Sequence, residues 1–124
     1  MRYRVGVREY FSAAHRIENH QGPCRNLHGH TYIVDVEVES NSLSEMNMVI
    51  DIILLKKIAR DAIEVLDHTY LNEVFRDKNV TSELIATYIL ERICTSLKAL
   101  GITFLGIKVR IYESPTSWIE VEYP

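Results

Sequence analysis

The chain is poor in the residues that mark specialised protein classes. Its 124 residues include two cysteines, three prolines, five glycines and one tryptophan. So little glycine and proline excludes a fibrous or a disordered composition. The opening residues alternate between polar and apolar and form no apolar stretch of the signal-peptide type. We therefore expect a cytoplasmic protein in which Cys24 and Cys94 are reduced thiols and do not form a disulfide.

Long apolar runs and an excess of positive charge are missing as well. The longest apolar run, Ile52 to Leu55, stops at Lys56 and is too short to span a membrane. The net charge of −3 argues against a general nucleic-acid binder, which normally carries a basic surface. We expect neither a membrane nor a nucleic acid as partner. A small anionic substrate stays compatible with the sequence, because lysines and arginines can cluster locally.

What the sequence does contain is typical of one globular domain. Hydrophobic residues make up 47% of the chain and charged residues 25%, which is ample for one packed interior. The length leaves no room for a second core, so we expect a single domain over residues 1–124. A chain this small buries a modest fraction of its surface, and assembly into a homo-oligomer would add stability.

Hydrophobic periodicity predicts strands and helices in the order ββααββ. The strands are expected at about 3–14, 28–39, 104–113 and 117–123, and the helices after Asp51 and from Thr81 to Gly101. Asp51 has the side chain of a helix N-cap, and Gly101 is well placed to end the second helix. The natural packing is an α+β fold with two helices on one face of a four-stranded antiparallel sheet.

The strongest chemical signal is the sequence His28-Gly29-His30. Residues i and i+2 of a strand point to the same face, so both imidazoles can approach one metal ion; two unrelated surface histidines are the alternative. His15 ends the first strand on a face that an adjacent antiparallel strand can bring beside this pair. Three histidines with an open fourth position are typical of catalytic zinc, although copper, nickel and iron also bind imidazole.

A cysteine and an acid–histidine pair are further candidates. Cys24 lies four residues before His28, where it is either a fourth metal ligand or a catalytic thiolate. Asp67-His68 stands where the first helix ends and is either a capping pair or a proton relay. Cys94 is better interpreted as a small residue of the core.

Glu113 closes the third predicted strand just before a Ser-Pro turn. A carboxylate there is either ordinary solvated surface or a binding group that accepts two parallel N–H bonds from an amidine-like ring edge. His20 and Asp51 are interpreted as structural or solvated.

Together these pieces resemble the 6-pyruvoyl tetrahydropterin synthase/6-carboxytetrahydropterin synthase family across essentially the whole chain. Each matching segment is weak alone, but all stand in the right order on the right elements. The segments are Phe11–His15, Cys24–His30, Val49–Asp51, Leu66–Asn72, Thr81–Glu83 and Tyr112–Ser117. One departure is Val80, where many relatives have proline before Thr-Ser-Glu.

The resemblance implies the tunnelling fold, in which ββααββ subunits form trimers whose sheets close into a barrel and, in many members, stack into hexamers. It implies an active site shared between subunits. The residues it assigns are zinc ligands at His15, His28 and His30, a general base at Cys24, a relay at Asp67 and His68 of a neighbouring subunit, a pterin anchor at Glu113, and a pterin-pocket border at Thr81 and Ser82.

The implied activity is conversion of 7,8-dihydroneopterin triphosphate. Only three residues separate Cys24 from His28, which resembles the 6-carboxytetrahydropterin synthase branch feeding 7-deazaguanine (queuosine or archaeosine) synthesis. Two alternatives within the class are a 6-pyruvoyl tetrahydropterin synthase and a related dihydroneopterin-cleaving lyase. A non-catalytic zinc-binding module, with Cys24 as fourth ligand, is the alternative outside it. Arg16 and Arg25 are candidates for neutralising the triphosphate.

Overall fold

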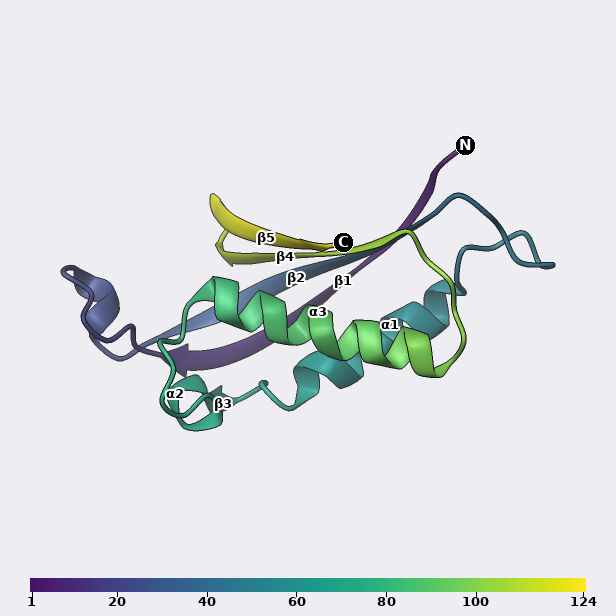
Figure 1. Ribbon diagram of the computed structural model, residues 1–124. Coiled ribbons are helices and arrows are strands. Elements are labelled where there is room, and N and C mark those ends of the chain that lie inside the picture. The colour runs from purple at the N-terminus through teal and green to yellow at the C-terminus, as the bar shows by residue number, and fades with distance from the viewer.

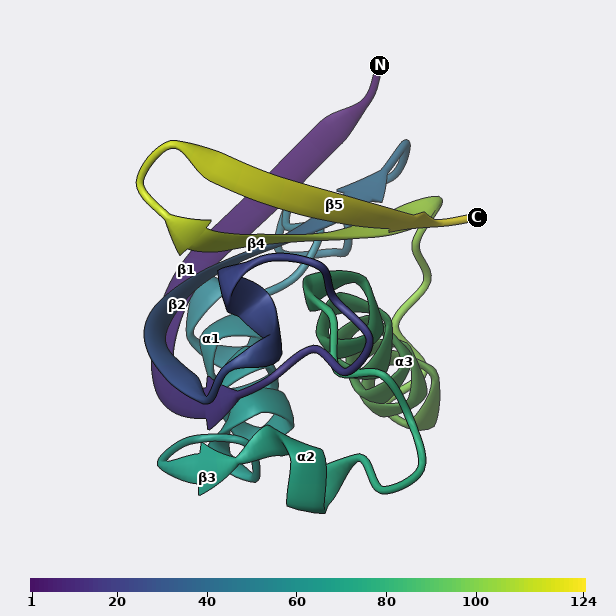
Figure 2. The same cartoon turned by 90° about the vertical axis from the view of Figure 1, so that its left-hand side faces the viewer.

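Two helices cover one face of a twisted sheet, and the other face of the sheet is left open (Figures 1 and 2). The computed structural model describes all residues from 1 to 124. The strands are β1 (Tyr3–His15), β2 (His28–Ser40), β3 (Thr69–Tyr70), β4 (Gly106–Ser114) and β5 (Ser117–Tyr123). The helices are α1 (Ile52–Glu64), α2 (Leu71–Val74) and α3 (Ser82–Ala99), with a short 3-10 helix, η1, at Pro23–Arg25.

The sheet has five strands in the order β3-β1-β2-β4-β5. Strands β1, β2, β4 and β5 pair antiparallel, whereas β3 pairs parallel to β1 at Ala13 and Ala14. The α+β class is therefore confirmed, but the expectation of a purely antiparallel, four-stranded sheet is wrong. Two residues of β3 are too few to show an alternating pattern, and their pairing depends on contacts with a distant part of the chain.

The core lies between the sheet and the helices. Alternate residues of β2 (Tyr32, Val34, Val36 and Val38) are buried under α1 and α3. Helix α1 turns Leu55, Ala59 and Ala62 toward them, and α3 does the same with residues three and four apart. Full burial of one such leucine or isoleucine contributes about 1.5–3 kcal/mol. Cys94 packs against this core, as the sequence predicts.

Both long helices begin at side-chain caps. The carboxylate of Asp51 accepts a hydrogen bond from the Ile53 backbone N–H at 2.8 Å, and the Thr81 hydroxyl accepts one from Leu84 at 3.2 Å. Gly101 follows α3 with a φ of 71°, a conformation that glycine adopts without steric cost. No helix in the protein has both the length and the apolar character needed to cross a membrane.

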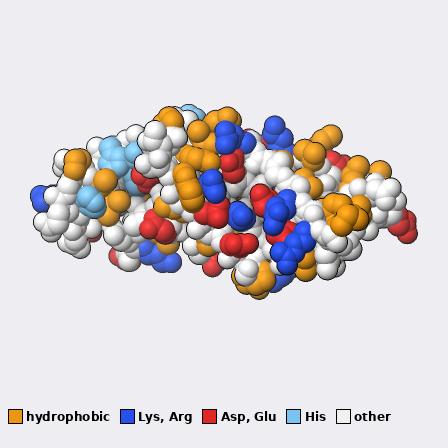
Figure 3. Space-filling model, turned by 90° about the horizontal axis from the view of Figure 1, so that it is seen from above, with side chains coloured by type: hydrophobic (Ala, Val, Ile, Leu, Met, Phe, Trp, Pro, Cys, Tyr) orange, Lys and Arg blue, Asp and Glu red, His pale blue; other side chains and the backbone are white.

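The open face of the sheet carries interleaved charges (Figure 3). Arg8 donates two hydrogen bonds to Asp35, at 2.6 and 2.9 Å, and Arg110 pairs with Glu120 at 2.9 Å. Exposed pairs of this kind contribute at most about 1 kcal/mol each. The sign of these charges alternates from strand to strand, basic on β1 and β4 and acidic on β2 and β5, which keeps this face polar and leaves the apolar face to receive the helices.

Candidate metal centre and adjoining pocket

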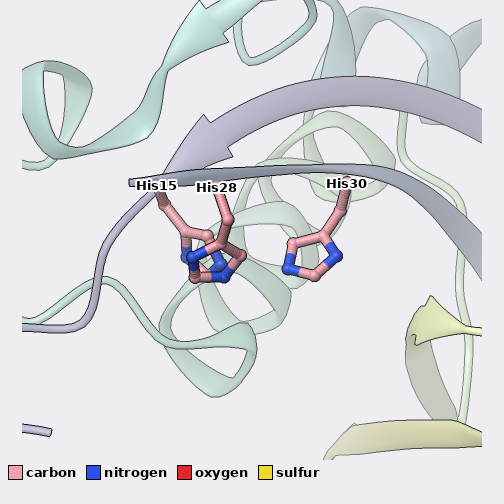
Figure 4. A group of neighbouring side chains, drawn as sticks. All are labelled: His15, His28 and His30. Atoms are coloured by element: carbon pink, nitrogen blue, oxygen red, sulfur yellow. The ribbon is translucent and has the colours of Figure 1, made fainter. Parts of the chain in front are cut away.

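The end of β1 meets the beginning of β2, and this register gathers three histidines. His15 lies opposite His28, and Ala13 lies opposite His30. One nitrogen of each imidazole lies within 4.8 Å of the others. Figure 4 shows the three rings turned toward a common point under the two strands. The structure therefore brings together the three residues that the sequence selected as metal ligands.

Two of the rings are oriented by backbone carbonyls. His15 Nδ1 lies 3.0 Å from the Val80 carbonyl oxygen, and His28 Nδ1 lies 2.7 Å from that of Asn26. A carbonyl only accepts, so Nδ1 donates in both rings and Nε2 keeps its lone pair. The Nε2 atoms of His15 and His30 are buried and have no hydrogen-bond partner. A lone pair directed inward, with the opposite nitrogen anchored, is the arrangement that metal-ligating histidines adopt.

The surroundings keep the His15 imidazole neutral. Burial of the ring lowers the pKa of His15, and the neighbouring His28 lowers it further. A neutral imidazole is the form that binds a metal. The Tyr32 ring lies 5.4 Å from that of His30, and its buried hydroxyl has no partner. The donor set and the unpaired nitrogens thus fit a divalent ion such as zinc, which would take four ligands and so keep one position beyond the three imidazoles.

A pocket of about 420 Å³ lies between the N-terminus of α3 and strands β4 and β5, and its wall includes Thr81, the residue after the one whose carbonyl contacts His15. Thr81, Ser82 and Glu113 all line it, so the three residues linked to pterin binding by resemblance lie on one pocket. The buried Ser82 hydroxyl donates a hydrogen bond to the Glu113 carboxylate. Two residues before Ser82, the Val80 carbonyl contacts His15, so the metal centre and the pocket share a three-residue segment, residues 80–82.

Other residues of the pocket wall had no clear signal in the sequence. They include Ile17, His20, Asn79 and Trp118. His20 was interpreted as structural or solvated, yet its ring lies in the wall and its Nδ1 accepts the Gly22 N–H at 2.9 Å. In the sequence, the only indication that these residues belong to the site is that Ile17 and His20 lie a few positions after His15 and that Trp118 lies a few positions after Glu113.

Cys24 lies apart from the histidine cluster. Its sulfur is not among the atoms that gather around the candidate metal position. The residue belongs to η1, its side chain is partly exposed, and its carbonyl accepts the Ile17 N–H at 2.7 Å. That hydrogen bond ties the thiol-bearing turn to the residues that follow His15.

Asp67 and His68 contact each other but belong to neither the cluster nor the pocket. Asp67 Oδ1 accepts the Ser12 N–H at 2.9 Å and lies 3.0 Å from His68 Nδ1, while Oδ2 accepts from Arg60 at 3.1 Å. The Ser12 hydrogen bond, together with the charges of His68 and Arg60, lowers the pKa of Asp67. The His68 side chain is 83% exposed, so its imidazole faces away from its own chain, whereas Asp67 is 24% exposed and is held by that chain.

The two candidate arginines for the triphosphate differ in setting. Arg16 lines a second pocket of about 740 Å³, whose wall also contains Lys78 and three acidic side chains. Its guanidinium lies 3.4 Å from Glu18. Arg25 is exposed at the end of η1. Neither arginine side chain forms a hydrogen bond with the three histidines.

Comparison with known proteins agrees with this geometry. The model of a protein family described as 6-pyruvoyl tetrahydropterin synthase matches residues 4–124. A 6-carboxy-5,6,7,8-tetrahydropterin synthase of Synechocystis is 40% identical over 112 residues, covering 86% of this chain and 83% of the relative. One of Rickettsia felis is 31% identical over 130 residues, covering 90% and 94%.

Solved structures show the same fold. The 6-pyruvoyl tetrahydropterin synthase of Caenorhabditis elegans superposes with a TM-score of 0.83 at 26% identity, covering 100% of this chain and 97% of that one. The corresponding enzyme of Plasmodium vivax superposes at 0.83 with 21% identity, covering 99% and 98%. With the match extending over almost the full length, the chain belongs to the 6-pyruvoyl tetrahydropterin synthase family.

Proposed function

We propose that this protein is a zinc-dependent 6-carboxytetrahydropterin synthase. It converts 7,8-dihydroneopterin triphosphate to 6-carboxy-5,6,7,8-tetrahydropterin, acetaldehyde and triphosphate, a reaction of 7-deazaguanine synthesis. The observation that carries the proposal is the juxtaposition of two sites. Three clustered histidines, of which His15 and His30 have buried Nε2 atoms without a partner, are linked through residues 80–82 to a pocket that presents the Glu113 carboxylate.

Each residue has a defined part in this proposal. His15, His28 and His30 would hold a zinc ion, which would supply a Lewis acid for the oxygens of the substrate side chain. Glu113, oriented by Ser82, accepts two parallel N–H bonds from the pterin edge and holds the ring in place. The Cys24 thiolate removes a proton from the side chain of the substrate.

Asp67 and His68 act from a neighbouring subunit. The lowered pKa of Asp67 keeps this carboxylate ionised near neutral pH, so its Oδ1, which lies 3.0 Å from His68 Nδ1, can orient the adjacent imidazole. His68, being exposed, is available to a second chain. In this arrangement the imidazole exchanges a proton with the Cys24 thiol across the subunit interface, and the enzyme is a trimer or hexamer.

The choice of branch is supported by sequence and by relatives. Three residues between Cys24 and His28 resemble the 6-carboxytetrahydropterin branch. The curated relatives that are 31% and 40% identical carry that name. The 6-pyruvoyl tetrahydropterin synthase alternative is supported by the solved structures of similar fold. A purely structural zinc module is disfavoured because the Cys24 sulfur lies outside the cluster.

Product analysis tests the proposal. The purified, zinc-loaded protein is incubated with 7,8-dihydroneopterin triphosphate, the pterin product is identified by chromatography, and acetaldehyde is followed with a coupled dehydrogenase. We expect 6-carboxy-5,6,7,8-tetrahydropterin and acetaldehyde in equal amounts. Clean 6-pyruvoyl tetrahydropterin without acetaldehyde would contradict the branch. An unchanged substrate, with Glu113→Gln as a matched blank, would contradict an enzyme of this class.

A further inference from the structure

The last residues of β1 are held along their outer edge by one short segment, residues 67–72. Ser12 is bound at both backbone groups: its N–H donates to the Asp67 carboxylate at 2.9 Å, and its carbonyl accepts the His68 N–H at 2.6 Å. Strand β3 then pairs with Ala13 and Ala14. This pairing ends at Ala14 and Tyr70, so on this side the backbone pairing reaches the residue before the metal ligand His15 but not Arg16, the residue after it.

The side chain of Asn72 continues the pairing past the end of β3. Its Oδ1 accepts the Arg16 N–H at 2.9 Å, and its Nδ2 donates to the Arg16 carbonyl at 3.0 Å. One amide thus satisfies both backbone groups of Arg16, as a neighbouring strand would. Asn72 is itself fixed, because the preceding residue, Leu71, is fully buried in the core.

This clamp acts directly next to a metal ligand. His15 is the last residue of β1 and is fully buried, and the chain after it turns into an irregular loop. The next backbone anchor along the chain is the Ile17 N–H, which donates to the Cys24 carbonyl at 2.7 Å. If Arg16 is released, the last backbone pairing on this side is that of Ala14 with β3, and His15 is held only by its pairing with His28 on the other side. The Ile17 hydrogen bond links the released segment to the loop that carries Cys24.

We propose that Asn72 is a positioning residue of the metal centre: its amide clamps Arg16 and so keeps the His15 imidazole aligned with His28 and His30. This inference rests on the proposed function only in assuming that the three histidines bind zinc. Groups that orient metal ligands from outside the coordination sphere typically change metal affinity about 10- to 100-fold. The effect of Asn72 is expected at the lower end, because it acts on the backbone of the ligand's neighbour.

Zinc affinity tests this role without relying on turnover. Three variants are compared with wild type by chelator competition: Asn72→Leu, which removes both hydrogen bonds, Asn72→Asp, which keeps only the acceptor, and Glu73→Leu as a control on the same helix. Absorption of the Co²⁺-substituted proteins reports the geometry of the ligands. Thermal unfolding establishes that each variant is folded at the temperature of the measurement.

The expected result is a zinc affinity about 10-fold lower for Asn72→Leu, an intermediate loss for Asn72→Asp, a changed Co²⁺ spectrum in both, and no change for Glu73→Leu. A loss of thermal stability with zinc affinity and Co²⁺ spectrum as in wild type would show a merely structural role and overturn the inference. If Asn72→Leu does not fold, Asn72→Asp decides by the same criteria. The variant His15→Ala distinguishes this inference from the proposed function. If His15→Ala loses zinc and the Asn72 variants keep it, the role of Asn72 is rejected and the assignment of the zinc ligands stands.

Discussion

At the scale of single residues, Val80 links the two halves of the site. Its backbone carbonyl holds His15, while the next two residues, Thr81 and Ser82, line the pocket and Ser82 holds Glu113. The family resemblance implies proline at this position in many members, and proline and valine both carry a backbone carbonyl. The departure therefore leaves the acceptor for His15 intact, and the substitution changes only the side chain and the N–H.

Zinc content is the first property that single substitutions should change. His15→Ala, His28→Ala and His30→Ala each leave two imidazoles, which make a poor site, so we expect each purified variant to lose most of its zinc. Metal analysis by mass spectrometry measures it. His20→Ala is the matched control, because that ring lies outside the cluster. Full stoichiometric zinc in all three variants would refute the ligand assignment.

Cys24 should affect the rate and leave the metal in place. Because its sulfur lies outside the histidine cluster, Cys24→Ala is expected to retain zinc and to bind the pterin. Removal of a general base typically slows turnover about 10²- to 10⁴-fold. Single-turnover kinetics and metal analysis on the same preparation separate the two effects, with Cys94→Ala as the second-thiol control. Joint loss of zinc and activity would instead identify Cys24 as a fourth ligand.

Glu113 should show the complementary defect. Glu113→Gln keeps the shape of the side chain but loses the charge that strengthens its hydrogen bonds with the pterin edge. Hydrogen bonds to charged groups contribute about 1.5–3 kcal/mol, so substrate affinity should fall about 10- to 100-fold with zinc unchanged. Equilibrium titration with a non-reacting pterin measures this affinity. Glu122→Gln, on the exposed end of β5, is the control.

At the scale of elements, periodicity predicts the long strands and helices because each buries one face. The alternation in β1 and β2 and the apolar stripes of α1 and α3 are direct consequences of that burial. Strand β3 is different. Its two residues pair with Ala13 and Ala14, more than fifty positions earlier, and no local pattern encodes such a contact.

Like the fold, the candidate site was predictable from the sequence only where the signal is local. A spacing of two residues places His28 and His30 on one face of a strand, which is local information. The register that puts His15 opposite His28 depends on the fold of the loop between the strands. The carbonyls of Val80 and Asn26 that orient the rings could not be predicted from the sequence. Every residue has a backbone carbonyl, so the amino-acid type does not indicate which carbonyl accepts a hydrogen bond from a histidine.

The attachment of α1 to β1 through Asp67 should depend on pH. The Ser12 hydrogen bond and the nearby cations lower the pKa of Asp67 in the folded protein. The ionised carboxylate therefore stabilises the fold above the pKa of the unfolded chain, about 3.9, and this contribution is lost as the pH falls through the folded-state value. Asp67→Asn removes the charge but keeps an acceptor for Ser12.

Urea unfolding between pH 2 and pH 7 measures this contribution. Wild type should be more stable than Asp67→Asn near neutral pH, and the difference should shrink on acidification. Asp61→Asn is the control, since that carboxylate is exposed and pairs only with Lys57 one helical turn away, a pair worth about 0.3–0.5 kcal/mol. A difference between wild type and Asp67→Asn that stays constant with pH would argue against an ionised Asp67.

At the scale of the whole molecule, the sheet has two open edges. Strand β5 forms one edge, and β3 covers only the last part of β1, so most of β1 lacks a partner strand on its outer side. Unpaired edges are usually blocked or joined to another chain. Pairing of these edges between subunits would close a barrel, as the family resemblance implies, and would enclose the charged open face of Figure 3.

Mixing two inactive variants tests whether neighbouring subunits share the active site. Cys24→Ala lacks the base but presents an intact Asp67-His68 pair, and His68→Ala has the opposite defect. In an oligomer reassembled at random from equal amounts, about a quarter of the sites combine an intact thiol with an intact relay. Activity of the mixture should therefore rise from the level of the parents to about a quarter of wild type.

The mixing experiment requires proof that the two variants exchange subunits. Tagging the variants differently and purifying the mixture over both affinity tags provides this proof. Wild-type subunits mixed with themselves under the same conditions give the recovery after reassembly. Because His68 is exposed and lies outside its own pocket, the expected gain requires a second chain. A mixture that exchanges subunits fully but remains as inactive as either parent would show that Cys24 and His68 do not meet across an interface.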